Sequence, residues 1–217
     1  MPQDGRWVCL DVGETLIDET RIWSLWADEV GVPRLTFLAA LGAVVERGGE
    51  HGEVFGWFGL DPDEWRARMP AVEAQYGGFR DEDLYPDVRR ALAALRAAGL
   101  RLAIVANQPA VRTEQLRSLG IEAEVLAMSG EMGVAKPDPA FFTRALELMG
   151  EPPPGSVAYV GDRIDNDVVP AAAAGMRAVW IRRGPWGVIQ QPPAGVDPAL
   201  VVDSLDELAA RIGEAWS

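Results

Sequence analysis

The sequence predicts an α/β fold in which a doubly wound parallel sheet carries an inserted helical segment. From about residue 84 onward, apolar strand-like runs alternate with helical patterns. This order is typical of βαβ units and of a mostly parallel sheet with helices on both faces. Between residues 17 and 83 the apolar residues recur at helical spacing with little strand pattern, which predicts a helical insertion. The 217 residues are enough for a core with a small accessory domain.

The first strand is the apolar run that begins at Trp7 and delivers Asp11 into a glycine-containing turn. A carboxylate at the end of a buried strand is costly unless it is paired or bound to a metal. In an open α/β sheet, ligands bind at the carboxyl ends of the strands. Asp11 is therefore a candidate functional residue, and the alternative is that it caps the turn or the following helix.

The helical insertion is expected to contain helices at Leu35–Val45 and Asp63–Tyr76, the second with a proline and acidic residues near its start. An aromatic cluster separates the two helices, and we expect the aromatic side chains to form a core of their own. The alternative for Trp23 or Trp26 is that its side chain faces a ligand instead of this core. His51, the only histidine, is interpreted as a surface or loop residue rather than a catalyst.

The rest of the chain supplies the other strands of a Rossmann-like sheet and the helices that cover it. We predict helices at residues 88–98, 111–119, 140–149, 168–174 and 205–216. We predict strands at residues 100–106, 125–128, 157–160, 177–181 and 200–202. The segment 182–198, which is rich in Gly, Pro and Trp, is expected to be a loop. In a parallel sheet the carboxyl ends of all the strands lie at one edge, and we expect the crossovers to be right-handed.

The formal net charge of the chain is −13 at pH 7. Contacts with nucleic-acid phosphates or with anionic lipids need a basic surface, so we expect neither a nucleic acid nor a membrane as a partner. Cys9 is the only cysteine, which excludes an internal disulfide and favours a packing role in the first apolar run. Without a membrane-length apolar span or a signal-peptide pattern at the N-terminus, the chain is expected to be cytoplasmic.

Polar side chains follow the predicted strands and should converge. Asp11 and Asn107 follow two of them, and Asp162 follows a third with Asp167 close behind. Lys136, the only lysine, lies between these positions and would add positive charge for an anion or a nucleophile. Two bare carboxylates repel each other, whereas Mg²⁺ prefers such oxygen ligands. The sequence therefore predicts a magnesium site, and the alternative for the acidic cluster is a solvated helix cap.

On these residues the chain resembles the haloacid dehalogenase (HAD) superfamily of hydrolases. The motifs are Asp11 in DVGETL, Lys136 in GVAKPDPAFF, and Asp162 with Asp167 in VGDRIDND. Each motif alone is modest, but their order and spacing together are highly specific, and the resemblance covers the whole chain. The resemblance implies a hydrolase, of the phosphatase-like branch, that acts on a small phosphorylated metabolite.

The resemblance also implies how the chain is divided. Residues 1–16 and 84–217 would form the catalytic core, and residues 17–83 would form a helical cap domain of the family's first type. Such a cap closes over the site, excludes water and selects the substrate.

The mechanism implied by the resemblance has two steps. Asp11 attacks a phosphoryl group and forms an aspartyl-phosphate, which is covalent catalysis by a carboxylate. Mg²⁺, held by Asp11, the backbone carbonyl of Gly13 and Asp162, neutralises the transferring oxygens. Lys136 holds the charge of the nucleophile and of the phosphoryl group, and Asp167 supports the metal site.

Two positions of the motif that contains Asp11 depart from the phosphatase pattern. The residue two after the nucleophile is usually an Asp that serves as the general acid, and here it is Gly13. General acid–base catalysis contributes about 10²–10⁴-fold, so a substrate with a good leaving group, such as an acyl or aryl phosphate, is favoured. Gly13→Asp is then expected to raise activity. Glu14 also replaces the family's usual glycine and is the nearest candidate substitute for the missing acid, but we favour a solvent-facing or loop-bracing role for it.

A further departure lies at the end of the predicted strand 100–106, where the family has its second motif. Ala106 stands where the family has Thr or Ser, so one hydrogen bond to the phosphate, worth about 1.5–3 kcal/mol, is missing. Asn107 would face the phosphate or the cap.

Three functions follow from these departures. The first is a magnesium-dependent phosphatase, and the second is a degenerate member that binds a phosphorylated ligand or a protein partner without turnover. The third is a metal-independent dehalogenase, which Asp162 and Asp167 disfavour. A phosphonate-cleaving mechanism needs a cap lysine, which residues 17–83 lack.

Overall fold

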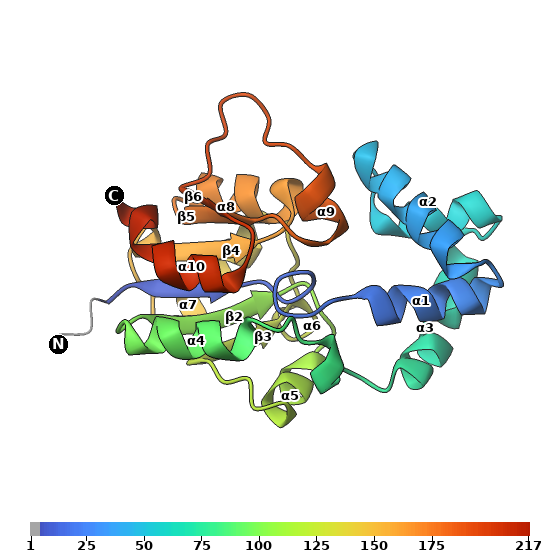
Figure 1. The fold of residues 1–217 in the computed structure, drawn as a ribbon, viewed down its shortest axis with the longest axis horizontal. Helices are drawn as coiled ribbons and strands as arrows, with labels where there is room; N and C mark the ends of the chain where they lie inside the picture. Colours follow the sequence, from blue (N-terminus) through green and yellow to red (C-terminus); the bar gives the residue numbers. More distant parts are fainter. Residues whose placement is uncertain (1–4) are drawn as a thin grey trace.

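The computed structural model describes residues 5–217, and within them six parallel strands form one sheet in the order β3-β2-β1-β4-β5-β6 (Figure 1). The strands are β1 (Trp7–Leu10), β2 (Arg101–Ala106), β3 (Val125–Met128), β4 (Val157–Gly161), β5 (Arg177–Ile181) and β6 (Leu200–Val202). β1 lies in the middle, between β2 and β4. The order along the sheet reverses beside β1, which is where doubly wound sheets bind ligands. The predicted fold class is therefore confirmed.

Helices cover both faces of the sheet, α4 and α10 on one face and α7 and α8 on the other. The helices of this part are α4 (Val88–Ala97), α5 (Val111–Ser118), α6 (Ser129–Met132), α7 (Pro139–Leu148), α8 (Val169–Ala173), α9 (Gly184–Ile189) and α10 (Leu205–Arg211). Successive side chains of a strand point to opposite faces. Val8 and Leu10 accordingly pack in the core beneath α4 and α10, whereas Trp7 and Cys9 pack beneath α7 and α8. Cys9 is a fully buried packing residue, as expected.

The helical insertion, residues 17–83, lies beyond the carboxyl ends of the strands (Figure 1). It contains α1 (Thr20–Val30), α2 (Arg34–Glu46), the 3₁₀ helix His51–Phe58 and α3 (Pro62–Tyr76). Its aromatic side chains form a separate core, in which the rings of Trp26 and Phe55 lie 4.7 Å apart. Asp61 caps α3 by accepting from the backbone N–H groups of residues 63 and 64, which explains why this helix was predictable.

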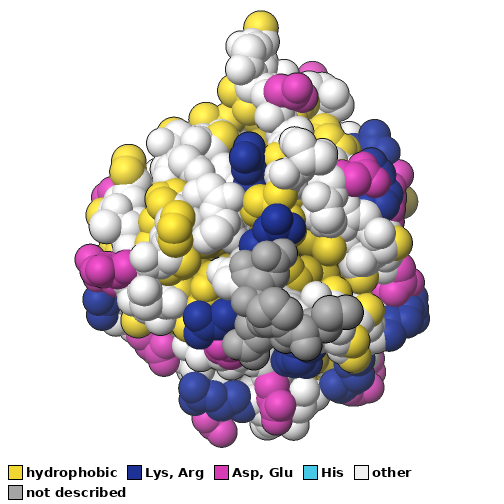
Figure 2. Space-filling model, turned by 90° about the vertical axis from the view of Figure 1, so that its left-hand side faces the viewer, with side chains coloured by type: hydrophobic (Ala, Val, Ile, Leu, Met, Phe, Trp, Pro, Cys, Tyr) yellow, Lys and Arg dark blue, Asp and Glu magenta, His cyan; other side chains and the backbone are white. Residues whose placement is uncertain are grey.

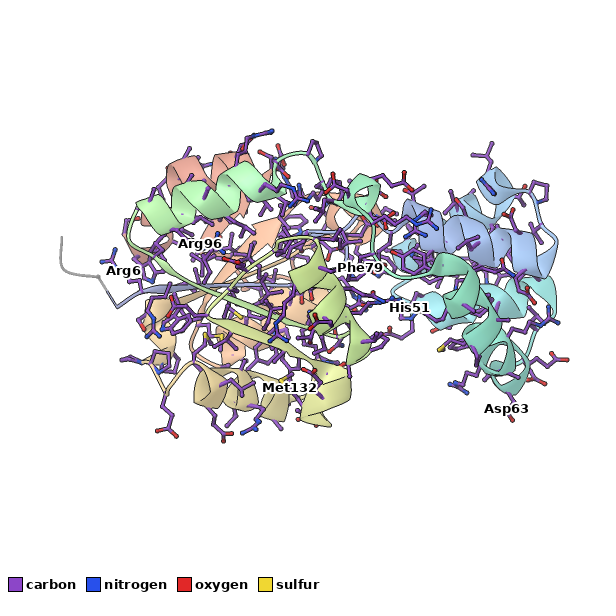
Figure 3. All side chains as sticks on the ribbon, turned by 90° about the horizontal axis from the view of Figure 1, so that it is seen from below. Arg6, His51, Asp63, Phe79, Arg96 and Met132 are labelled. Carbon is purple, nitrogen blue, oxygen red and sulfur yellow. The ribbon has the colours of Figure 1, made fainter. Side chains whose placement is uncertain are left out.

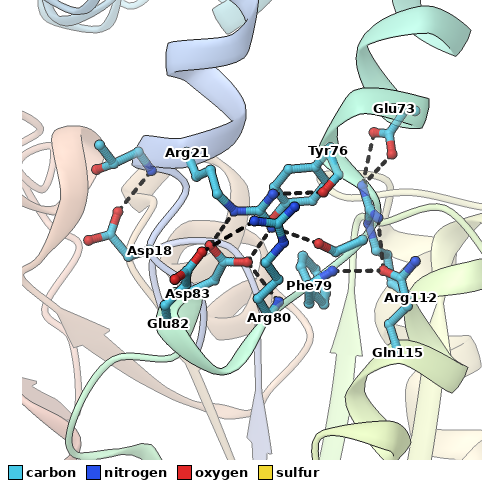
Figure 4. A network of polar contacts seen from close by, with 12 residues as sticks. Asp18, Arg21, Glu73, Tyr76, Phe79, Arg80, Glu82, Asp83, Arg112 and Gln115 are labelled. Carbon is cyan, nitrogen blue, oxygen red and sulfur yellow. Dashed lines mark hydrogen bonds and ion pairs between the residues drawn. The ribbon is translucent and has the colours of Figure 1, made fainter.

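The two chain segments that join the insertion to the sheet lie against each other. The N–H of Asp18 donates to the carbonyl of Asp83 at 2.8 Å, and that of Tyr85 donates to Leu16 at 3.0 Å. The Arg21 guanidinium binds both oxygens of Asp83, at 2.7 and 2.5 Å (Figure 4). This pairing supports the predicted division after residues 16 and 83, which stays a prediction.

Three of the predicted segments differ from the structure. The segment 182–198 was expected to be a loop but contains α9, in which Pro185 occupies the first turn and Trp186 packs into the core of the insertion. That burial is a tertiary contact without a local sequence signal. The helix expected at 168–174 is preceded by a π-helical turn, Ile164–Val168, and the last predicted helix finishes in the 3₁₀ turn Ile212–Trp216.

The two ends of the molecule differ in character. The end remote from the insertion, where the strands begin, carries acidic and basic side chains around its rim (Figure 2). Arg6 and Arg96 lie toward this end, whereas His51 and Phe79 lie at the junction of the sheet and the insertion (Figure 3). Among residues 5–217, no helix combines the length and the apolar character needed to cross a membrane.

Candidate active site

The central strands bring three of the predicted polar residues to one edge of the sheet. Asp11 follows β1, and its N–H donates to the carbonyl of Val160 in β4 at 2.9 Å. Asp162 follows β4, and Asn107 follows β2. All three residues line one cavity between the sheet and the helical insertion. The parallel register thus assembles residues that are up to 151 positions apart in the chain.

Lys136 is buried at this edge and joins two of the carboxylates. Its Nζ lies 2.7 Å from Oδ1 of Asp11 and 2.5 Å from Oδ1 of Asp167. Burial lowers the pKa of a lysine, but the charges of Asp11 and Asp167 outweigh burial and raise the pKa of Lys136. The ammonium group therefore stays charged in a site where a solitary lysine would tend to lose its proton.

Three carboxylates lie close enough to share a cation. One oxygen from each of Asp11, Asp162 and Asp167 falls within 4.8 Å of the others, and all three residues are buried. Among residues 5–217, Oδ2 of Asp162 finds no hydrogen-bond partner. A buried carboxylate oxygen without a partner is costly, and a divalent cation with oxygen ligands would satisfy it. The donor set present therefore fits a hard cation.

The electrostatics of the cluster point the same way. Burial raises the pKa of Asp11 to about 6, against the opposing charge of Lys136. Burial, followed by the charges of Asp167 and Asp11, holds the pKa of Asp162 well above its ordinary value. Lys136 supplies one positive charge to three carboxylates, so negative charge remains to attract a cation. Asp167 also accepts from the Arg163 N–H at 3.0 Å, which fixes it behind the other two.

Asn107 does not present its amide to the cavity in the way the sequence suggested. Its Oδ1 accepts from the backbone N–H of Lys136 at 2.8 Å, and its Nδ2 donates to the carbonyl of Lys136 at 2.9 Å. Both ends of the side chain are therefore used to hold the lysine segment in place. Asn107 lines the cavity, but its geometry is that of a residue that positions Lys136.

Glu14, the nearest candidate for the missing acid, lines the cavity, and hydrogen bonds hold its carboxylate. Its φ of +49° lies in the left-handed region, and its carboxylate accepts from the Tyr85 hydroxyl at 2.5 Å and from the Glu19 N–H at 3.1 Å. Burial raises its pKa, and the hydrogen bond from Tyr85 opposes the rise. Glu14 thus braces the loop after β1 against the chain entering α4, which agrees with the loop-bracing interpretation.

Glu19 was not singled out from the sequence, yet it lies beside Gly13. A Cβ placed on Gly13 would lie 2.6 Å from Oε1 of Glu19. Burial raises the pKa of Glu19 to about 7, with further contributions from the charges of Glu14 and Asp11. The expectation that Gly13→Asp raises activity stays a prediction, and a side chain at residue 13 would have to displace the Glu19 carboxyl group.

The cavity has a volume of about 410 Å³ and is bounded by both parts of the chain. The sheet contributes the carboxylates and Lys136, and the insertion contributes side chains that include Trp23, Trp26 and His51. Trp23 and Trp26 thus belong both to the core of the insertion and to the cavity wall. His51 lies edge-on to Trp23 and Trp186, with ring centroids 5.6 and 6.3 Å away.

Ion pairs join the two parts around this cavity. Arg112 of α5 donates to both carboxylate oxygens of Glu73 in α3, at 2.9 and 2.7 Å (Figure 4). Arg163, after β4, lies 3.3 Å from Glu50 in the insertion. The insertion is therefore held over the strand ends by ion pairs whose four residues line the cavity.

The segment that begins at Arg182 supports the loop after β1. Arg183 is buried, pairs with Asp87 at 3.0 Å and donates to the backbone carbonyls of Glu14 and Thr15. Trp186 follows in α9 and lines the cavity. The segment is thus a structural support, with one aromatic side chain in the cavity wall.

Comparison with known proteins agrees with this geometry. The family model of haloacid dehalogenase-like hydrolases matches residues 6–175. Over 122 residues the chain is 41% identical to a phosphoserine phosphatase of Thermus thermophilus, covering 55% of this chain and 48% of that protein. Over 129 residues it is 39% identical to a glyceraldehyde 3-phosphate phosphatase of Methanopyrus kandleri, covering 58% and 55%.

The fold has a solved counterpart along nearly its whole length. A predicted phosphoglycolate phosphatase from Haemophilus somnus superposes with a TM-score of 0.73 at 22% identity, covering 98% of this chain and 99% of that one. The matches to the two curated relatives span about half of each relative's length. Because the family model matches more than half of the chain, the protein belongs to the haloacid dehalogenase-like hydrolase family.

Proposed function

We propose that this protein is a magnesium-dependent phosphatase that hydrolyses a small phosphorylated metabolite through an aspartyl-phosphate on Asp11. The observation that carries the proposal is the cluster of Asp11, Asp162 and Asp167 within 4.8 Å at the cavity floor, with Lys136 bound to two of them. A covalent carboxylate nucleophile needs a fixed position and a charge partner, and this cluster offers both. The similarity to phosphoserine and glyceraldehyde 3-phosphate phosphatases supports the same reaction class.

In the first step the Asp11 carboxylate attacks phosphorus, and the bond between phosphorus and the leaving-group oxygen breaks. Lys136 holds Oδ1 of Asp11 at 2.7 Å, which fixes the carboxylate and opposes the rise in pKa that burial causes. In the second step water attacks the phosphorus of the acyl phosphate, which releases phosphate and restores Asp11. Both steps place extra negative charge beside Lys136, where a buried ammonium group stabilises it most.

Asp11 and Asp162 would hold the magnesium ion, with the backbone carbonyl of Gly13 and with Asp167 supporting the site from behind. When bound, Mg²⁺ neutralises the charge on the transferring phosphoryl oxygens. The oxygen of Asp162 that lacks a hydrogen-bond partner supports this assignment. Asn107 would act through Lys136, whose backbone it holds at 2.8 and 2.9 Å.

The size and lining of the cavity support a small substrate. A cavity of about 410 Å³ is of the size that takes small metabolites. Its wall combines indole rings with Arg112 and Arg163, each of which is already paired with a glutamate of the insertion. Residues 17–83 would act as a cap that excludes water during phosphoryl transfer.

Metal removal tests the proposal directly. With millimolar Mg²⁺ the protein is expected to hydrolyse p-nitrophenyl phosphate, and chelation is expected to lower the rate by at least about 10²-fold, because the charge of the transferring oxygens is then opposed by Lys136 alone. Re-adding Mg²⁺ should restore the rate. The measurement is the initial rate of p-nitrophenolate release, with inorganic phosphate counted in parallel.

The same assay separates the alternatives. Saturable binding of Mg²⁺ and phosphate with no turnover of aryl or alkyl phosphates would contradict the proposal and favour a binding protein. Halide release from 2-haloacids that chelation leaves unchanged would favour a metal-independent dehalogenase. Phosphate release that persists unchanged in chelator would remove the magnesium ion from the mechanism.

A further inference from the structure

We propose that Glu19 is the proton donor to the leaving group in this reaction, acting from the space that Gly13 leaves open. The inference rests on the proposed phosphatase function and assigns one more catalytic residue to it. Glu19 lies outside every motif that carries the family resemblance. Its assignment comes from where the fold places its carboxyl group.

The carboxyl group of Glu19 occupies the position toward which a side chain at residue 13 would project. A Cβ on Gly13 would lie 2.6 Å from Oε1 and 3.1 Å from Cδ of Glu19. Gly13 is two residues after Asp11, and Asp11, Gly13 and Glu19 line the same cavity. A proton donor is needed beside the nucleophile, and here it comes from the residue preceding α1.

Contacts with two other segments hold Glu19 in this place, and a third segment fixes one of those partners. The Glu19 N–H donates to Oε1 of Glu14 at 3.1 Å, and Glu14 is itself fixed by the Tyr85 hydroxyl at 2.5 Å. Gln108, just after β2, donates from Nε2 to Oε1 of Glu19 at 3.3 Å. The start of the insertion is thereby tied to the sheet edge, so the carboxyl group is positioned before a substrate binds.

The other three glutamates of the cavity wall have partners of their own. Glu14 accepts from the Tyr85 hydroxyl at 2.5 Å and from the backbone N–H of Glu19 at 3.1 Å. Glu50 pairs with Arg163 at 3.3 Å, and Glu73 pairs with Arg112 at 2.7 Å. Within residues 5–217, Glu19 forms no ion pair with an Arg or Lys, whereas Glu50 and Glu73 each form one. Among these glutamates, Glu19 is the one whose carboxyl group occupies the place toward which a side chain at residue 13 would project.

The proton balance of the two steps is complete with this residue. As the Asp11 oxygen bonds to phosphorus, the carboxyl O–H of Glu19 gives its proton to the departing oxygen, and the substrate alcohol leaves neutral. The Glu19 carboxylate then takes a proton from the water that attacks the aspartyl-phosphate. Inorganic phosphate and the Asp11 carboxylate are released, and Glu19 is a carboxylic acid again. Alkyl phosphates, whose leaving groups need a proton, become substrates alongside aryl phosphates.

The test is the dependence of kcat/KM on the leaving group in Glu19→Gln. Gln keeps the size of the side chain and loses the proton. For an alkyl phosphate the rate is expected to fall by about 10²-fold or more, and for p-nitrophenyl phosphate, whose leaving group departs without a proton, by less than about ten-fold. Across a series of aryl phosphates, the rate should therefore depend more steeply on the pKa of the leaving group in the variant than in the wild type.

Two further variants separate proton donation from a structural role. Glu14→Gln, in the neighbouring carboxyl group, is expected to keep the wild-type dependence on leaving-group pKa whatever its overall rate. Gly13→Asp combined with Glu19→Ala moves the acid from residue 19 to residue 13 and should recover at least about ten-fold over Glu19→Ala for the alkyl phosphate. Gly13→Asp alone must displace the Glu19 carboxyl group and should give no such gain.

Each possible result either supports or overturns the assignment of Glu19 as the proton donor. Equal losses for all leaving groups in Glu19→Gln, or a changed dependence in Glu14→Gln but not in Glu19→Gln, would overturn the assignment while leaving the phosphatase in place. A wild-type protein that hydrolyses no phosphate ester overturns both the assignment and the proposed function. A steeper dependence in Glu19→Gln that the double variant reverses supports the assignment.

Discussion

Asp11→Asn is expected to lower the turnover of p-nitrophenyl phosphate by at least about 10³-fold, because an amide does not form the acyl phosphate on which both steps depend. The substitution keeps the size of the side chain. It also keeps the backbone N–H that donates to Val160 at 2.9 Å, so the loop after β1 should be retained. Initial rates in the presence of Mg²⁺ measure the loss, and the unfolding midpoint checks the fold.

Trapping the intermediate gives a second, independent measurement. Wild-type protein quenched in acid during turnover should carry a phosphoryl group that hydroxylamine removes, as expected for an acyl phosphate. Asp11→Asn should carry none. A phosphoryl group of this kind on the variant would place the nucleophile elsewhere.

Asp165→Asn is the matched control, since it makes the same chemical change in the neighbouring acidic motif. The Asp165 side chain is 47% exposed and lies 2.6 Å from Arg163. It is not among the three carboxylates that lie within 4.8 Å of one another in the described chain. The turnover of Asp165→Asn should stay within about three-fold of the wild type, because exposed ion pairs contribute roughly 0–1 kcal/mol. Equal losses in both variants would remove Asp11 from its proposed role.

Much of the fold was predictable because a parallel sheet is buried on both faces. Such strands appear in the sequence as continuous apolar runs, and the predicted strands 125–128, 177–181 and 200–202 coincide with β3, β5 and β6. Once the strands are known, the parallel arrangement brings their carboxyl ends to one edge. The closeness of Asp11 and Asp162 therefore followed from local patterns together with the rules of βαβ topology.

What the sequence did not reveal depends on contacts between distant segments. Glu14 is nearer than Glu19 to the nucleophile in the chain, but its backbone has a left-handed φ and its carboxylate is held by a hydrogen bond from Tyr85, 71 residues away. Glu19 reaches the vacated place because α1 begins at the sheet edge beside Gln108. In the same way, α9 was unexpected because its stability comes from Trp186 packing against the insertion.

Lys136→Met is expected to destabilise the protein as well as to lower turnover by at least about 10²-fold. Met has a similar length but loses the cation–π contacts with Phe141 and Tyr159, whose ring centroids lie 5.7 and 5.5 Å from Nζ. Removing one partner of a buried ion pair costs about 3–5 kcal/mol. For a chain of this size, that corresponds to a decrease in the unfolding midpoint of roughly 10 °C. The decrease in the unfolding midpoint is measured by thermal unfolding of both proteins without divalent cations.

The loss of stability should depend on pH and on Mg²⁺. The pKa of Asp11 is already raised to about 6 by burial, and removing Lys136 raises it further above its value in the unfolded chain. A carboxyl group with a raised pKa in the folded state favours folding at low pH, and this contribution is lost as the pH rises through that pKa. The difference in unfolding midpoint between wild type and variant should therefore grow from pH 5 to pH 8. Millimolar Mg²⁺ should recover more stability in the variant.

Arg182→Met removes a cation from an exposed pair and serves as the control. Arg182 lies 2.6 Å from Asp203, and both side chains are about half exposed. The variant should lose less than about 1 kcal/mol. That loss should not depend on Mg²⁺, because neither residue lies at the cavity. If Lys136→Met showed an equally small loss, the lysine would not be the group that balances the three carboxylates. If Lys136→Met lost stability and Mg²⁺ restored none of it, the carboxylates of Asp11, Asp162 and Asp167 would not be the ligands of a cation.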